Sequence, residues 1–172
     1  VGGIAFLLVF LFHGALFLTL KVEGELIERA RRAATSIGVA AAIAFLSLVG
    51  LTYTNTDLFN SSLASVALWG AVAVFVVSYV LTWMQKTGWA FAMSGFAIVF
   101  TTVAFFSGLF PRLMVSSLNP VWNLTIYNAS SSPYTLKIMT VAAIILVPIV
   151  LLYQGWTYWV FRKRVTVKDL EY

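Results

Sequence analysis

Hydrophobic and polar residues are arranged along this chain in long alternating blocks. We find five apolar blocks, at residues 1–20, 35–53, 63–84, 88–110 and 137–161. A helix needs roughly 20 apolar residues to cross about 30 Å of hydrocarbon. The pattern therefore predicts an all-α integral membrane fold with five transmembrane helices. A count of four plus one suits a four-helix bundle with one added peripheral helix.

Composition supports the membrane assignment and excludes several function classes. Hydrophobic residues make up 61% of the chain and charged residues only 10%, whereas a soluble domain has roughly a quarter charged residues. The chain has no cysteine, which excludes disulfides, thiolate-bound clusters and cysteine nucleophiles. The net charge of +5 does not indicate nucleic-acid binding, because the basic residues lie at the ends of the apolar blocks.

The distribution of basic residues predicts an orientation. One side of the membrane would hold most of them, namely Lys21, Arg29, Arg31, Arg32, Lys86, Arg162, Lys163, Arg164 and Lys168. The opposite side would hold Arg112 and Lys137. The positive-inside rule then predicts an external N-terminus and a cytoplasmic C-terminus. Because the chain starts with Val1 and is apolar at once, we interpret it as part of a longer subunit, beginning in or near a helix.

Small residues and prolines predict local features of the spans. Gly38, Ala41 and Ala42 in the second span, with Ala67, Gly70 and Ala71 in the third, offer faces for close helix packing. Pro148 predicts a kink in the fifth span. Residues 111–136 form a long polar connection on the outer side, rich in Ser, Asn and Pro.

Residues 21–32 are the most highly charged stretch. We interpret it as a cytoplasmic continuation of the first helix, with Glu25 pairing with Arg29 and Glu28 with Arg32. The carboxylates lie among exposed basic residues, which makes acid–base catalysis by them an unfavourable interpretation. No Ser/His/Asp set, phosphate-binding glycine loop or zinc-ligand spacing is present in the sequence, so no catalytic residue and no metal site is predicted.

His13 is the one titratable residue inside a predicted span, about 12 Å from Lys21 at about 1.5 Å per residue. Functional interpretations are a haem or metal ligand, a proton relay, or a hydrogen-bond partner of a quinone. The structural interpretation, which we favour, is a neutral histidine bonded to a neighbouring helix, with Gly14 allowing close approach. A haem ligand is disfavoured because a second ligand at suitable spacing is missing from the sequence.

Trp122 is the second candidate. It opens the polar and aromatic stretch 122–128, WNLTIYN, in the outer connection. Such a mixture suits a lipid headgroup or a quinone, and it equally suits anchoring of the loop at the membrane interface.

Several short motifs, taken in order, resemble one family. They are FHGA at 12–15, LTLK at 18–21, GEL at 24–26, Phe110-Pro111, Ser116-Ser117, LTIYNASS at 124–131, Thr135-Leu136 and YQGWTYW at 153–159. Together they resemble the C-terminal half of subunit II of cytochrome bd quinol oxidase, a bacterial respiratory oxidase. The resemblance covers essentially the whole chain, residues 1–172.

The resemblance implies that the chain contains helices five to nine of nine, in the bacterial cytoplasmic membrane. It implies a haem-free structural subunit in a heterodimer with subunit I, which carries haem b and haem d, oxidises quinol and reduces dioxygen to water. A small single-span accessory subunit is a further partner in this interpretation, and a structural quinone or lipid is the expected ligand. The resemblance also places the last span at the subunit interface, where Gly155 would admit a neighbour closely. The alternative that the residues leave open is part of a small-molecule transporter, for which broken helices or paired intramembrane charges would be the signature.

Overall fold

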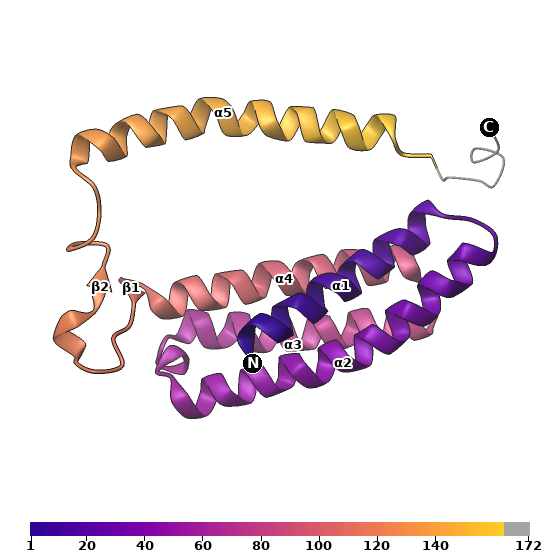
Figure 1. The fold of residues 1–172 in the computed structure, drawn as a ribbon, viewed down its shortest axis with the longest axis horizontal. Helices are drawn as coiled ribbons and strands as arrows, with labels where there is room; N and C mark the ends of the chain where they lie inside the picture. The colour runs from indigo at the N-terminus through magenta and orange to yellow at the C-terminus, as the bar shows by residue number, and fades with distance from the viewer. Residues whose placement is uncertain (164–172) are drawn as a thin grey trace. The chain divides into compact units, whose positions relative to one another are not determined.

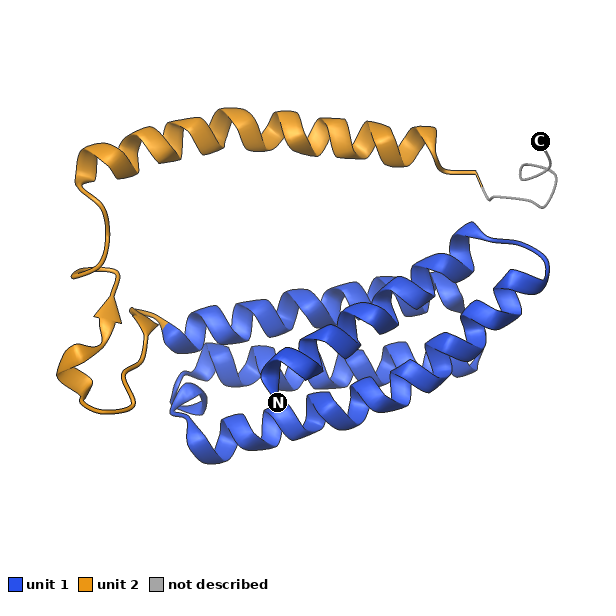
Figure 2. Cartoon of the chain, viewed as in Figure 1, with its two compact units in different colours: residues 1–109, 164–172 blue, residues 110–163 orange. Residues whose placement is uncertain are grey.

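The computed structural model describes residues 1–163 and divides them into two compact units, residues 1–109 and 110–163 (Figure 2). Five of its helices are long and apolar enough to cross a membrane, which confirms the predicted all-α membrane fold. Arg164 and Lys168, two of the basic residues behind the predicted orientation, lie outside the described residues.

The first unit is a four-helix bundle (Figure 1). Its helices are α1 (Gly2–Lys21), α2 (Glu25–Asn55), α3 (Ser62–Trp83) and α4 (Thr87–Leu109), with the short 3-10 helix η1 (Leu58–Asn60) before α3. Consecutive helices pack against each other, and α4 also packs against α1. The up-and-down order follows from the short connections, which only allow neighbours in sequence to be antiparallel neighbours in space.

Aromatic rings and alanines together fill the centre of the bundle. Phe75 of α3 lies 5.5 Å, between ring centroids, from both Phe12 of α1 and Phe45 of α2. All three rings are buried. Alanines occupy the closest helix contacts, and those with no exposed surface are Ala5, Ala34, Ala41, Ala64, Ala71, Ala90 and Ala104. Lipid offers no hydrophobic drive for helix association, so close packing of small residues supplies the attraction instead.

The predicted small-residue faces are confirmed at their centres. Gly38, Ala41, Ala67 and Ala71 are all buried in the bundle. At Gly38 the helices approach closely, because a Cβ atom there would lie 2.9 Å from ring atoms of Tyr79 and 3.0 Å from Phe12. Glycine therefore permits α2 to contact both neighbours at one level.

The interpretation of residues 21–32 as a continuation of the first helix is wrong. Helix α1 ends at Lys21, and α2 begins at Glu25. Gly24 between them has φ +67° and ψ −144°, a backbone conformation that residues with a Cβ atom rarely adopt. The chain reverses its direction at this glycine. Helix α2 therefore begins before the apolar block at 35–53, because the charged segment 25–34 is also helical.

One of the two ion pairs predicted in this stretch is confirmed and the other is wrong. Arg29 Nη2 lies 2.8 Å from Glu25 Oε1, as expected for residues four apart on a helix. Glu28 Oε1 instead lies 3.1 Å from Nη1 of Arg31, three residues on. Spacings of three and four residues both bring side chains together on a helix, so the sequence allowed either partner.

The second unit contains a small hairpin and one long helix. Strand β1 (Arg112–Met114) pairs antiparallel with β2 (Leu124–Thr125), with Arg112 opposite Thr125 and Met114 opposite Leu124. Between them lies the 3-10 helix η2 (Pro120–Trp122). Helix α5 (Pro133–Val160) starts where Ser132 Oγ accepts a hydrogen bond from the Thr135 N–H, at 3.3 Å. It continues as a helix on both sides of Pro148.

The close approach at Gly38 generates a stability prediction. Gly38→Val should lower the free energy of unfolding by about 1–3 kcal/mol, because the added methyl groups meet the Tyr79 and Phe12 rings. Gly50→Val, on the same helix, is the matched control, since nothing lies within 4 Å of a Cβ there. Thermal unfolding in detergent, followed by tryptophan fluorescence, measures both. Equal midpoints for the two variants would contradict the packing described here.

Candidate functional site

His13 lies on α1 against α4, half-buried in the side of the bundle. Its Nδ1 is 2.7 Å from the hydroxyl oxygen of Ser94, a buried residue of α4. Its ring stacks on Phe91, with centroids 4.4 Å apart and planes inclined by 21°. Phe17, one turn further along α1, also packs against Phe91, at 5.8 Å. The expectation that His13 bonds to a neighbouring helix is confirmed, and the partner helix is α4.

The hydrogen bonds of Ser94 assign the tautomer of His13. The Ser94 hydroxyl also lies 2.7 Å from the carbonyl oxygen of Phe91, which can only accept. A hydroxyl has one proton, so both bonds form at once only when the hydroxyl donates to the Phe91 carbonyl and His13 Nδ1–H donates to the hydroxyl. Nε2 then carries the lone pair. Within residues 1–163 it has no hydrogen-bond partner, and it is available as an acceptor.

Ser94 and Gly95 are the functional residues that sequence reasoning missed. A Cβ at Gly95 would lie 3.8 Å from His13 Cε1, so the glycine leaves room for the imidazole at the helix surface. The sequence signal was a serine followed by glycine inside a mostly apolar span, similar to the His13-Gly14 pair of α1, but Ser107-Gly108 of the same span has the same pattern. The pairing depends on the axial register of α1 and α4, which hydropathy does not report.

Metal ligands do not gather anywhere in the part of the chain that the structure describes. No three side chains of His, Asp or Glu lie close enough together there to hold an ion. At His13 one imidazole nitrogen is already bonded to Ser94 and one ring face lies on Phe91. The geometry therefore offers a single nitrogen, Nε2, to any ligand.

Trp122, the second candidate, lies in the hairpin unit with its side chain largely exposed. Asparagine side chains build the loop around it. Asn119 Oδ1 accepts from the Val121 N–H at 2.9 Å, and Asn123 Oδ1 accepts from the Ser116 N–H at 2.8 Å. Asn128 Nδ2 donates to the Asn123 carbonyl at 3.0 Å. These bonds fix the backbone of the turn while leaving the indole free to contact lipid, a ligand or another protein.

The two candidates belong to different units, His13 to the bundle and Trp122 to the hairpin unit. Each therefore has to be considered with the residues of its own unit. His13 has a defined hydrogen bond and stacking partner, whereas Trp122 has a defined backbone and an exposed side chain.

Comparisons with known proteins all indicate the same family. The family model for cytochrome bd terminal oxidase subunit II matches residues 1–161. Cytochrome bd ubiquinol oxidase subunit 2 of Bacillus subtilis (strain 168) is 39% identical over 171 residues, which are 98% of this chain and 50% of the relative. Cytochrome bd-I ubiquinol oxidase subunit 2 of Escherichia coli (strain K12) is 39% identical over 108 residues, 60% of this chain and 28% of the relative.

A more distant relative agrees with these two. The probable cytochrome oxidase subunit 2 of Haemophilus influenzae is 27% identical over 186 residues, covering 91% of this chain and 49% of the relative. The chain thus spans about half the length, or less, of the curated relatives it matches.

Proposed function

The chain belongs to the cytochrome bd terminal oxidase subunit II family, and we propose that it is the C-terminal half of a haem-free structural subunit in a bacterial quinol oxidase. In this proposal the partner, subunit I, holds haem b and haem d, oxidises quinol and reduces dioxygen to water. A small single-span subunit is a further proposed partner. The observation that carries the proposal is the match of one family along residues 1–161.

The exposed surface of α5 supports the role of an interaction subunit. Within its own unit this helix of 28 residues buries none of its side chains, although most of them are apolar. Nothing lies within 4 Å of a Cβ at Gly155, which leaves a notch between large aromatic residues. A glycine notch on a membrane helix is the feature that lets a second helix approach closely. We assign this face to the contact with subunit I.

The ends of the helices support the proposed orientation, with the C-terminus in the bacterial cytoplasm. The guanidinium of Arg162 lies 4.6 Å from the centroid of the Trp159 ring and donates to the Trp159 carbonyl at 3.1 Å. An arginine and a tryptophan joined at the last turn form a typical anchor at a membrane interface. The basic turn at 29–32 and Lys86 belong to the same side by the positive-inside rule.

His13 in the bundle and Trp122 in the hairpin unit are proposed as two separate contacts, each for a structural quinone or lipid. His13 Nε2 accepts a hydrogen bond, so it suits a hydroxyl of a quinol better than a carbonyl of an oxidised quinone, which also only accepts. Trp122 offers an exposed apolar face with a donor N–H, which suits the headgroup region of a lipid or a quinone ring. Neither residue is assigned to the reaction with dioxygen.

The transporter alternative is less well supported. Transporter sites are built from discontinuous helices or paired charges inside the membrane. Helix α5 runs through Pro148 without interruption, and the pairs Arg29–Glu25 and Arg31–Glu28 lie in the charged segment 25–31, with exposed carboxylates. Family membership and these features together favour the oxidase proposal.

The structural role is tested by removing the subunit. We expect the haem-bearing partner, purified without the full-length form of this subunit, to lose haem, because apolar surface that α5 and the bundle cover would be left to detergent. Haem content is measured by pyridine haemochrome spectra relative to protein. Unchanged haem retention without this subunit would overturn the stabilising role.

The quinone proposal is tested in the purified complex. His13→Ala removes an acceptor whose hydrogen bond is worth about 1 kcal/mol, so we expect roughly fivefold weaker quinone retention. Ser94→Ala should give a partial loss, because the imidazole loses the bond that orients it, and Trp122→Ala tests the loop. Ser47→Ala, whose hydroxyl only bonds to the Ile43 carbonyl of its own helix, is the control. Extracted quinone is quantified by chromatography. A quinone content equal to that of the wild type in both His13→Ala and Trp122→Ala would overturn the proposal.

A further inference from the structure

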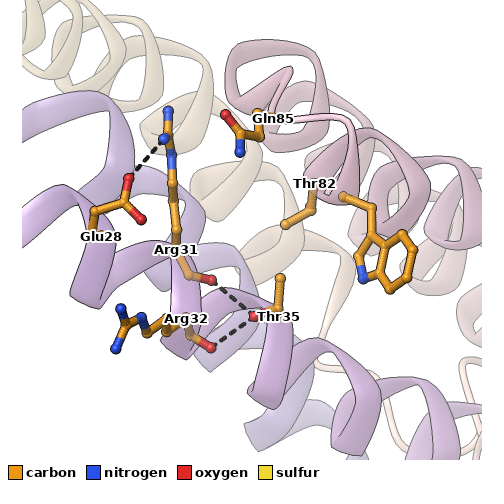
Figure 3. A pocket seen from close by; sticks show the side chains of 7 residues that line it. Glu28, Arg31, Arg32, Thr35, Thr82 and Gln85 are labelled. Atoms are coloured by element: carbon orange, nitrogen blue, oxygen red, sulfur yellow. Dashed lines mark hydrogen bonds and ion pairs between the residues drawn. The ribbon is translucent and has the colours of Figure 1, made fainter.

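A polar cavity lies at the end of the bundle where the chain turns from α1 to α2 and from α3 to α4. Its volume is about 250 Å³, and it is lined by Glu28, Arg31, Arg32, Thr35, Thr82, Trp83 and Gln85. Figure 3 shows the Arg31 side chain extended between Glu28 on its own helix and Gln85 on the opposite side of the cavity. All of these residues belong to the first unit.

Arg31 has hydrogen-bonding capacity that the protein does not use. Its Nη1 donates to Glu28 Oε1 at 3.1 Å. Its Nε is covered from solvent and has no hydrogen-bond partner among the described residues. Nε is thus a donor without a protein acceptor, and arginine N–H donors are the groups that bind carboxylates and phosphates in pairs.

The charges of the cavity suit a ligand with a single negative charge. Arg31 and Arg32 contribute two positive charges, and Glu28 contributes one negative charge, which leaves a net charge of about +1. Neither the Arg29–Glu25 pair nor the Arg31–Glu28 pair involves Arg32. A phosphodiester carries one negative charge, so it would neutralise the cavity without displacing Glu28 from Arg31.

Among the other polar groups of the lining, Gln85 is the one with donors to offer. The Thr35 hydroxyl already donates its proton to the carbonyls of Arg31 and Arg32, at 3.2 and 2.9 Å, and the Thr82 hydroxyl donates to the Ser78 carbonyl at 2.9 Å, so neither has a proton left for a ligand. Gln85 has a φ of +59°, unusual for a residue with a side chain, and this conformation ends α3 with the amide beside the cavity. Its amide NH₂ adds donors to those of the two arginines.

An apolar groove adjoins the polar cavity. It is lined by Tyr79, Val80, Trp83 and Met84, and has a volume of about 380 Å³. Trp83 lines both the cavity and the groove. Tryptophan is enriched at the level of lipid headgroups, where its ring contacts both polar and apolar parts of a lipid. A molecule with an anionic head and an acyl chain would therefore place each part in the matching site.

We propose that this cavity binds the phosphate of an anionic glycerophospholipid, with Arg31 and Arg32 holding the phosphate and an acyl chain lying along the groove of Tyr79, Val80 and Met84. The site is distinct from His13 and Trp122, and it does not depend on quinone binding or on the identity of the partner subunit. It would attach one lipid molecule to the bundle at the junction of α2 and α3.

The test uses the full-length subunit in its purified complex, with phosphatidylglycerol added in detergent and bound lipid counted by native mass spectrometry. We expect Arg31→Gln and Arg32→Gln each to weaken phosphatidylglycerol retention by about tenfold or more, as for loss of a charge-assisted hydrogen bond. Arg29→Gln is the matched control, because Arg29 is on the same helix, pairs with Glu25 and is outside the cavity lining. It should change retention less than twofold.

Two further arms distinguish the ligand. Phosphatidylcholine should be retained more weakly than phosphatidylglycerol, because its choline brings a positive charge next to the two arginines. Millimolar inorganic phosphate should not displace the lipid, because phosphate alone cannot use the groove. Arg32 is exposed, so its substitution keeps the test valid if Arg31→Gln fails to fold. Wild-type retention in Arg32→Gln, equal losses in Arg29→Gln, equal retention of the two lipids, or displacement by phosphate would each overturn the proposal.

Discussion

The hydrocarbon interior of a membrane holds no water, and this constraint determines most of the structure. Every backbone N–H and C=O in a span must be bonded within the protein, which restricts the spans to helices. Hydroxyl groups follow the same rule, since Thr52 donates to Leu48 and Thr101 to Ala97 within their own helices. Two polar contacts instead join helices: Ser78 donates to the Ala90 carbonyl at 2.7 Å, and His13 bonds to Ser94. Both involve α4, so this helix is tied to α3 and to α1 by groups that have no alternative partner in lipid.

Hydropathy predicts features that depend on solvent, and it misses features that depend on a single backbone conformation. The five helices follow from apolar length, and the buried faces of Gly38 and Ala67 follow from residue size. The end of α1 was misjudged because Gly24 reverses the chain through a positive φ, while the charged residues after it are good helix formers. The hairpin at 112–125 was also not predicted, because asparagine side chains, rather than a hydrophobic period, fix its turns.

The candidate site, too, was predictable from the sequence only in part. A buried histidine needs a partner, which is why a neighbouring helix was expected at His13, but the identity of Ser94 depends on how α1 and α4 are aligned. Arg31 was interpreted as one of several solvated charges, since its sequence neighbours are charged as well. In the folded bundle its Nε is covered from solvent and has no partner in the described chain. The sequence therefore shows which residues are polar, whereas packing decides which of their hydrogen-bond donors and acceptors have no partner in the protein.

In our proposal the chain provides apolar surface, and α5 is the face that contacts the haem-bearing partner. Photocrosslinking from this helix in the full-length complex tests that claim most directly. A photoreactive residue in place of Leu151, one turn from Gly155 on the same face of the helix, should crosslink to the partner subunit. One in place of Tyr153, about 160° around the helix from Leu151 at 100° per residue, should mainly crosslink to lipid. Lipid adducts alone from both positions would contradict the account.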